Sequence, residues 1–411
     1  MTRLPRPTPR RSRPSIARPA AGFALLIGLI GALGAACDDS DDAAAGGTPL
    51  LHLDGGTSDA VAPSDGTAPD RATLDADATA DQGEPPLPDE GPPTRHDVGA
   101  DAALVDDGGA TDGSGGMQAD PGDPEVPGPF MVRTERFDVD LGDRDNLPST
   151  VPVTVFAPVT PGPSPAVIFS HGFNIAPEAY ARYGDRLASH GVITVMARYD
   201  EGLFAVRTHL GLAEDTIALI DWLLADDSPL AGRVDADAIG LAGHSRGGKQ
   251  SIHAATLDPR VAAVIGIDPV DAAPPLSNDP AAFPSVTPEL MNALLVPNAY
   301  IGAGRGAEGL MACAPAAENY HAYFVAAPPP TTEYLMPMAG HSDFVDTCAD
   351  GGQDLICAVC PGAVDKAPLH DMAVALVTAF MRVHLAGDRD YQPWVDGPAI
   401  AAVPFVEVSR R

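Results

Sequence analysis

Lysine is almost absent from this 411-residue chain: Lys249 and Lys366 are the only two, against 56 acidic residues and a formal net charge of −31. Nucleic-acid binding needs clustered lysine and arginine side chains to contact phosphates, so this composition argues against a nucleic-acid partner. Long apolar runs are also scarce. Outside residues 20–36 no stretch is long enough to span a bilayer, which excludes a membrane protein with several spans.

Aromatic residues are absent from 38–128, a stretch that holds 22 acidic residues and only two arginines, Arg71 and Arg95. Such a segment cannot bury enough apolar surface to offset the loss of chain entropy on folding. We therefore expect residues 38–129 to form a disordered acidic linker. The remaining 130–411, about 280 residues, suit one large α/β domain.

The N-terminal segment, residues 1–37, is typical of an export signal. It contains six arginines and no acidic residue, and its apolar run at 20–36 ends directly before Cys37. Gly34-Ala35-Ala36 before Cys37 resembles a bacterial lipoprotein cleavage site, after which the cysteine carries lipid. Leu33 lies one place earlier than the leucine of that pattern. The alternative is an ordinary signal peptide or an uncleaved anchor.

Lipidation of Cys37 would make the acidic linker a solvated tether between a membrane and the folded domain. The sequence therefore predicts an exported, membrane-anchored bacterial lipoprotein that faces the periplasm or the cell exterior. The membrane is the partner expected at the N-terminus.

Cysteine usage agrees with export. Apart from Cys37 there are four cysteines, an even number that favours two disulfides in an oxidising compartment, with three possible connectivities. The four are Cys313, Cys348, Cys357 and Cys360. A zinc site is the alternative, because Cys357 and Cys360 have C-x-x-C spacing and the other two could complete four ligands. We favour disulfides and expect no metal.

From residue 131 onward, short β-branched runs alternate with amphipathic segments. This order predicts βαβ units, and hence a mostly parallel central sheet with helices on both faces. The strands are apolar throughout, as expected where both sides of a sheet are buried. The expected strands are 151–156, 166–170, 192–197, 239–242, 261–267, 299–302 and 333–336, and the expected helices are 177–190, 211–224, 247–257 and 369–385.

Gly243-x-Ser245-x-Gly247 fits a nucleophile elbow, a sharp strand-to-helix turn that exposes a serine hydroxyl. The bare pattern has low specificity, but an apolar strand ends directly before it and a helical pattern follows directly after. Since active sites of such sheets lie beyond the carboxyl ends of the strands, Ser245 is the candidate nucleophile. The alternative is a glycine-rich turn with an idle serine.

Serine needs a base that a carboxylate holds in place. In folds that carry a nucleophile elbow, the order along the chain is serine, acid, histidine. His341 follows the last predicted parallel strand and is the candidate base. His244 lies beside the nucleophile but is expected to point away from the elbow and to serve packing.

The sequence offers three candidates for the acid. Many relatives of the fold carry it after the strand at 299–302, but the turn after that strand contains no aspartate. Asp268 ends the preceding strand and is our candidate, with Asp271 second and Glu308 third. A turn-capping role is the alternative for Asp268.

Two backbone N–H groups, those of Phe173 and Arg246, are the candidates for an oxyanion hole. Phe173 follows the His171-Gly172 turn, where this fold supplies its second donor. No metal or organic cofactor is implied by this set of residues.

These motifs together resemble the chlorophyllases and related bacterial polyester-hydrolase-like enzymes, over about residues 165–387. The resemblance implies an α/β-hydrolase fold for 130–411 and hydrolysis of a carboxylic ester by the triad Ser245, Asp268 and His341. It leaves the substrate open between a small-molecule and a polymeric ester. The matching motifs are Gly243-His-Ser-Arg-Gly-Gly248, Ile265-Gly-Ile-Asp-Pro-Val270, Cys313-Ala-Pro315 with Asn319, Gly340-His-Ser-Asp343, and Cys357 to Cys360.

Two other functions remain compatible with the sequence. A catalytically idle surface protein could use the same fold for adhesion, although an idle relative is expected to lose the serine or the histidine. A thioesterase or a peptidase could use the same residues on another substrate.

Overall fold

The structure is a computed structural model that describes residues 122–143, 148–160, 162–199, 206–274, 277, 279–309, 312–352 and 355–411. The expectations for the signal segment 1–37, for Cys37 and for 38–121 concern residues outside this part of the chain. The last residues of the expected linker are described, and they contact the domain. The Gly128 N–H donates to the Ser189 hydroxyl at 3.0 Å, and His190 Nε2 lies 2.9 Å from the Val126 carbonyl oxygen.

Within the described residues, nine strands form one sheet in the order β1-β2-β4-β3-β5-β6-β7-β8-β9. The six central strands, β4-β3-β5-β6-β7-β8, pair in parallel with one another. The outer strands β1, β2 and β9 run antiparallel to their partners. The strands are β1 Val132–Asp140, β2 Thr150–Pro158, β3 Ser164–Ser170, β4 Ile193–Ala197, β5 Val234–His244, β6 Val261–Ile267, β7 Asn298–Ala303, β8 Thr331–Met336 and β9 Glu407–Arg410.

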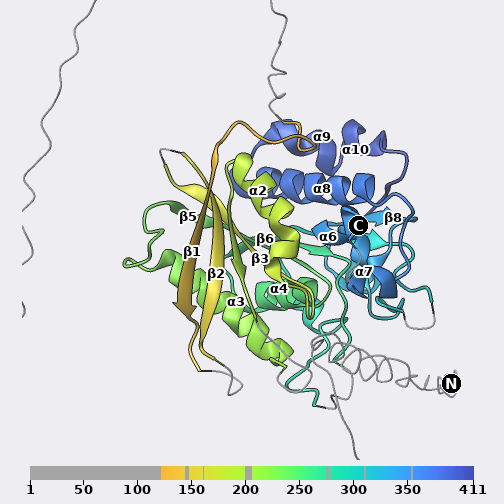
Figure 1. Cartoon of the computed structure of the whole chain (residues 1–411), viewed down its shortest axis with the longest axis horizontal. Coiled ribbons are helices and arrows are strands. Elements are labelled where there is room, and N and C mark those ends of the chain that lie inside the picture. The colour runs from red at the N-terminus through yellow and green to blue at the C-terminus, as the bar shows by residue number, and fades with distance from the viewer. Residues whose placement is uncertain are drawn as a thin grey trace, which may run out of the picture. The chain divides into compact units, whose positions relative to one another are not determined.

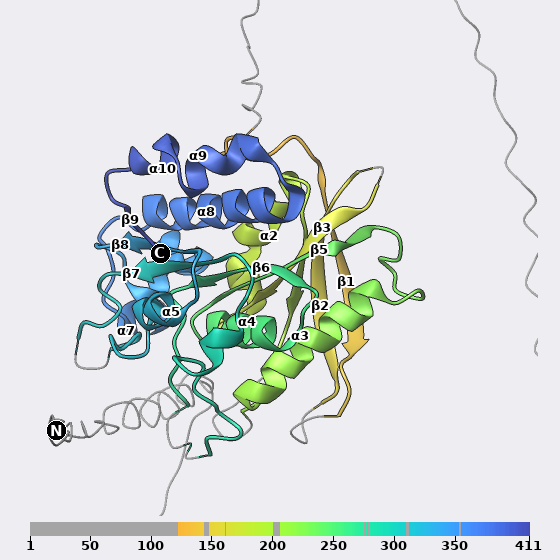
Figure 2. The same ribbon diagram turned by 180° about the vertical axis from the view of Figure 1, so that it is seen from behind.

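Helices cover both faces of this sheet. Helices α2 and α8 pack on one face, and α3, α4 and α5 pack on the other (Figures 1 and 2). The helices are η1 Pro177–Tyr180, α2 Ala181–Ser189, α3 His209–Leu224, α4 Arg246–Leu257, η2 Leu290–Ala293, α5 Tyr320–Ala326, η3 His341–Phe344, α6 Asp346–Ala349, α7 Leu355–Val359, α8 Ala367–Ala386, η4 Arg389–Tyr391, α9 Gln392–Val395 and α10 Pro398–Ala401.

Alternation along the central strands produces one core on each face. In β3, Val167 and Phe169 join the core under α2 and α8, while Ala166 and Ile168 join the core under α3 and α4. Successive side chains of a strand point to opposite faces, so a strand covered on both sides must be apolar throughout. The predicted α/β-hydrolase fold, with its mostly parallel sheet between two helical layers, is confirmed.

The two strands that the sequence pattern missed, β1 and β9, lie at the edges of the sheet. Strand β1 contains five charged residues and buries only one side chain fully, and β9 is a four-residue strand with no buried side chain. Edge strands bury little on either face, so their apolar periodicity is weak. Helix α5 is also short, and only its Asn319 cap, which accepts from the His321 N–H at 3.1 Å, marks its start.

The sequence expectation that only residues 20–36 could span a bilayer needs a correction, because helix α8 is also long and apolar enough; it is the one such helix among the described residues. However, 72% of its apolar window is buried inside the domain. A helix that is apolar on most sides and enclosed by protein is a core helix. Gly387 caps its C-terminus, with a φ of 66° in the left-handed conformation common at helix C-termini.

The four cysteines of the domain form two disulfides, as predicted. Cys313 bonds to Cys360, with 5.8 Å between their Cα atoms, and Cys348 bonds to Cys357, with 5.2 Å. The two bonds differ in loop length, since the first closes 47 residues and the second closes 9. The longer loop contains all of β8 and His341.

The loop lengths predict unequal contributions to stability. Replacing Cys313 and Cys360 by serine should lower the free energy of unfolding by about 4 kcal/mol, and replacing Cys348 and Cys357 by about 2.5 kcal/mol, because the longer loop constrains the unfolded chain more. Urea denaturation of the two double variants measures both values. A larger loss from the Cys348/Cys357 pair would contradict this entropic ranking.

Candidate active site

Ser245 lies on a sharp turn between the end of β5 and the start of α4. Its φ is 58° and its ψ is −123°, a combination that costs a non-glycine residue about 1–3 kcal/mol. The flanking glycines allow this turn. A Cβ on Gly247 would overlap the carbonyl oxygen of Ser170, and a Cβ on Gly243 would overlap the backbone of Gly247. The first turn of α4 therefore lies directly against the end of β3.

The structure brings Ser245, His341 and Asp268 together. His341 Nε2 lies 2.9 Å from Ser245 Oγ, and His341 Nδ1 lies 2.7 Å from Asp268 Oδ2. With a neutral imidazole, the serine hydroxyl donates to Nε2 and the Nδ1–H donates to the carboxylate. Asp268 and His341 are buried, whereas Ser245 is partly exposed. A serine with this chain behind it can act as a nucleophile toward a solute.

Asp268 is fixed by β7, the neighbour of the strand that carries it. Its own N–H donates to the Ile301 carbonyl at 2.7 Å, and its Oδ1 accepts from the Ala303 N–H at 3.2 Å. Gly306 leaves room for the second carboxylate oxygen, since a Cβ there would come within 3.0 Å of Oδ2. The φ of Asp268 is 40°, so this side chain also stands on an unusual backbone turn.

The two alternative acids have other partners. Asp271 is buried, pairs with Lys249 Nζ at 3.2 Å, and accepts from the backbone and hydroxyl groups of residues 285–287 at 2.5–3.1 Å. Glu308 is exposed and pairs with Arg305 at 3.0 Å. Asp271 therefore anchors the segment 285–287, and no hydrogen bond joins either carboxylate to His341 in the structure.

The candidate oxyanion donors lie on two segments that touch. A Cβ on Gly247 would meet the His171 carbonyl oxygen at 2.6 Å, so the residues after β3 contact the first turn of α4. The Arg246 guanidinium lies 5.3 Å from the centre of the Phe173 ring. The Phe173 and Arg246 N–H groups thus belong to adjacent backbone segments beside Ser245.

Three neighbouring side chains, for which the sequence predicted no hydrogen-bonding role, hold these segments. His171 Nδ1 lies 2.8 Å from the Gly172 carbonyl, and Tyr180 Oη accepts from the Gly172 N–H at 3.3 Å. His244 was expected to serve packing, but both ring nitrogens are hydrogen-bonded: Nδ1 to Tyr180 Oη at 2.8 Å and Nε2 to the His341 carbonyl oxygen at 2.9 Å. Its position inside the elbow motif was the only sequence signal for this role, and nothing marked Tyr180.

Burial keeps these side chains neutral. Desolvation, followed by the charge of Arg246, lowers the pKa of His171 to about 4. Desolvation, followed by the nearby His341, lowers the pKa of His244 well below its usual value. Desolvation also raises the pKa of the Tyr180 hydroxyl. At neutral pH all three therefore act as uncharged hydrogen-bonding groups.

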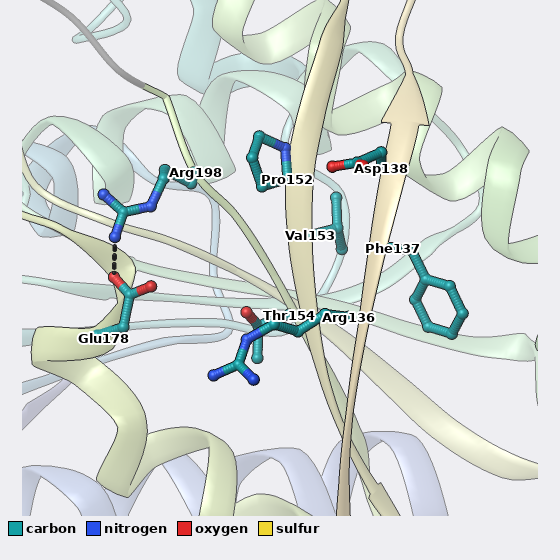
Figure 3. A pocket seen from close by; sticks show the side chains of 8 residues that line it. All are labelled: Arg136, Phe137, Asp138, Pro152, Val153, Thr154, Glu178 and Arg198. Atoms are coloured by element: carbon teal, nitrogen blue, oxygen red, sulfur yellow. Dashed lines mark hydrogen bonds and ion pairs between the residues drawn. The ribbon is translucent and has the colours of Figure 1, made fainter.

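No group of three or more histidine, cysteine, aspartate or glutamate side chains in the described ranges could hold a metal ion. A hollow of about 320 Å³ lies elsewhere, over β1 and β2, where Glu178 and Arg198 pair at 2.8 Å (Figure 3). Its lining includes none of Ser245, Asp268 and His341, so it is separate from the candidate active site. The hollow is lined by Arg136, Phe137, Asp138, Pro152, Val153, Thr154, Glu178 and Arg198.

Known proteins share the domain that carries this site. The family model described as chlorophyllase matches residues 127–410. The chain is 28% identical over 273 residues to chlorophyllase-1 of Arabidopsis thaliana, which covers 62% of this chain and 83% of that protein. It is 25% identical over 290 residues to the chloroplastic chlorophyllase-1 of Citrus unshiu, covering 68% and 86%.

A bacterial protein matches over a shorter stretch. Cutinase est2 of Thermobifida alba is 27% identical over 143 residues, which cover 34% of this chain and 45% of that protein. The chlorophyllase match is much broader, because the family model spans β1 to β9 and more than two thirds of the 411 residues. The chain therefore belongs to the chlorophyllase family.

Proposed function

We propose that this protein hydrolyses carboxylic esters, with Ser245 as nucleophile, His341 as general base and acid, and Asp268 as the carboxylate that orients the imidazole. The observation that carries the proposal is the continuous hydrogen-bond chain from Ser245 Oγ through His341 to Asp268, at 2.9 and 2.7 Å. Membership of the chlorophyllase family and the likeness to a cutinase support the same reaction, because both kinds of enzyme cleave esters.

The first half of the reaction forms an acyl-enzyme. Ser245 Oγ attacks the ester carbonyl carbon while its proton passes to His341 Nε2, and Asp268 stabilises the resulting imidazolium. The carbonyl oxygen becomes an oxyanion, which the N–H groups of Phe173 and Arg246 would stabilise. The bond between the acyl carbon and the alcohol oxygen then breaks, and the alcohol leaves with the proton from Nε2.

Water completes the reaction. His341 Nε2 takes a proton from a water molecule, whose oxygen attacks the acyl carbon and forms a second oxyanion. The bond to Ser245 Oγ then breaks, the proton returns to the serine, and the carboxylic acid leaves. Apart from the ester and water, each step uses only side chains and backbone groups of this protein. The substrate is a small-molecule or a polymeric ester.

Removing the nucleophile should abolish the reaction. Ser245→Ala should lower kcat for short p-nitrophenyl esters on the order of 10⁶-fold, since the members of such a triad act as a unit. Ser251 offers a matched control, because it lies in α4, is buried, and donates to the Ala242 carbonyl at 2.9 Å. Ser251→Ala should keep wild-type kcat, and a fluorophosphonate probe should label the control but not Ser245→Ala. Retained hydrolysis in Ser245→Ala would end the proposal.

The two aspartates should behave differently when each becomes asparagine. Asp268→Asn should lower kcat about 10⁴-fold, because an amide cannot stabilise the imidazolium or hold its tautomer. Asp271→Asn should change kcat less than tenfold but lower the free energy of unfolding by about 3–5 kcal/mol, because it leaves Lys249 buried beside an uncharged partner. Ester kinetics and urea denaturation measure the two effects. The reverse pattern in kcat would assign the acid to Asp271.

We also propose that the enzyme is exported and anchored to a membrane through lipid on Cys37, on the basis of the basic and apolar segments that precede this cysteine. Cys37→Ser should abolish metabolic labelling with a fatty acid and release the protein from the membrane fraction of the producing bacterium. Mass spectrometry of the mature N-terminus is the direct measurement. A mature wild-type chain without lipid on Cys37 would refute the anchor.

A further inference from the structure

A chain of hydrogen bonds runs behind the candidate active site, from the turn after β3 to the backbone of His341. The Gly172 N–H donates to Tyr180 Oη at 3.3 Å, Tyr180 Oη lies 2.8 Å from His244 Nδ1, and His244 Nε2 lies 2.9 Å from the His341 carbonyl oxygen. Tyr180 and His244 have no exposed surface. No water is needed to complete the chain.

The direction of every bond in this chain is fixed by its two ends. A carbonyl oxygen can only accept, so His244 Nε2 carries the proton. A neutral imidazole has one N–H, so Nδ1 is an acceptor and the Tyr180 hydroxyl must donate to it. The Tyr180 oxygen then uses a lone pair to accept from Gly172. Burial and the neighbouring His341 favour this uncharged form of His244, since both lower its pKa.

The two ends of this hydrogen-bond chain belong to two different parts of the proposed catalytic machinery. Gly172 directly precedes Phe173, whose N–H is the proposed oxyanion donor, and the other end is the backbone of the proposed base. The His244 ring also packs against the His341 ring, with 4.6 Å between the ring centres. A shift of about 1 Å between a reacting group and its partner can cost about 100-fold in rate. The chain is therefore suited to hold the oxyanion donor and the base at a fixed separation.

We propose that Tyr180 and His244 are positioning residues that set the distance between the oxyanion turn and His341, beyond any contribution to packing. This inference rests on the proposed ester hydrolysis, whose machinery it extends by two side chains that touch no reacting atom.

The protein contains a matched control for this proposal. Tyr391 Oη lies 2.7 Å from His190 Nδ1, and His190 Nε2 lies 2.9 Å from the Val126 carbonyl oxygen. A tyrosine hydroxyl, an imidazole and a backbone carbonyl are thus joined through the same atoms as in the hydrogen bonds of Tyr180 and His244, which we call the Tyr180–His244 bridge. The tyrosine and histidine ring centres are 5.6 Å apart in the control and 5.7 Å apart in the bridge. Neither Tyr391 nor His190 contacts a residue of the candidate active site through a hydrogen bond or ring contact in the described part of the chain.

Two phenylalanine variants compare the bridges. Tyr180→Phe should lower kcat for a p-nitrophenyl ester by about 10- to 100-fold, with KM changed less than about twofold, because it leaves Gly172 and His244 without their shared partner. Both variants should lower the urea midpoint of unfolding by similar amounts, but Tyr391→Phe should leave kcat and KM unchanged. Equal kcat values in the two variants would overturn the proposal, since each loses the same hydroxyl.

A second pair of variants tests whether the two residues act through one chain. His244→Gln should lower kcat at least as much as Tyr180→Phe, and the double variant should lose no more than His244→Gln alone. Multiplied losses would mean that the residues act independently and would overturn the bridge.

If a variant fails to fold, ¹⁵N NMR of the wild-type His244 still tests the proposal. A proton on Nε2 at neutral pH supports the hydrogen-bond chain, and a proton on Nδ1 refutes it.

Labelling of Ser245 by a fluorophosphonate separates this inference from the proposed function. Labelling needs the base and the oxyanion donors but no natural substrate. A wild type that labels while Tyr180→Phe labels 10- to 100-fold more slowly supports the bridge, and equal labelling rates refute it. A folded wild type that neither labels nor cleaves any ester would refute the proposed function and the bridge with it.

Discussion

The close approach of α4 to the end of β3 is the contact on which the rest of the site depends. No side chain fits at Gly243 or Gly247, because a Cβ on either would overlap backbone atoms. This approach forces Ser245 into a strained turn, and the strain persists because β5 is packed into the cores on both faces of the sheet and α4 into one of them. The serine hydroxyl is thereby held outside the sheet, and the start of α4 lies against the turn after β3.

The order of the strands explains how the remaining groups meet. Ser245, Asp268 and His341 follow β5, β6 and β8, so one strand, β7, separates the acid from the base. Strand β7 contributes no side chain to the hydrogen-bond chain between them. Its backbone instead anchors Asp268 on both sides, through the Ile301 carbonyl and the Ala303 N–H. The carboxylate can therefore reach across one strand to the imidazole without losing its orientation.

Much of this arrangement could be predicted from the sequence, because the central strands and the long helices carry strong apolar patterns. Asp268 and Asp271 could only be ranked, since three residues of separation do not tell which carboxylate faces the sheet edge. The structure separates them through Lys249, a buried cation that pairs with Asp271. Tyr180 could not have been found: a tyrosine in a helical segment is usually a core residue, and its role depends on a glycine N–H and an imidazole from distant segments.

The Cys313–Cys360 disulfide links the segment beside Asp268 to the segment beside His341. Cys313 precedes Ala314, whose N–H donates to the Gly306 carbonyl beside Asp268. Cys360 precedes Pro361, which lies against Gly340 and so beside His341. Loops usually open one at a time, at a smaller free-energy cost than the whole domain. Here an opening of the segment beside the carboxylate must also displace the segment beside the imidazole, so these two loops cannot open independently.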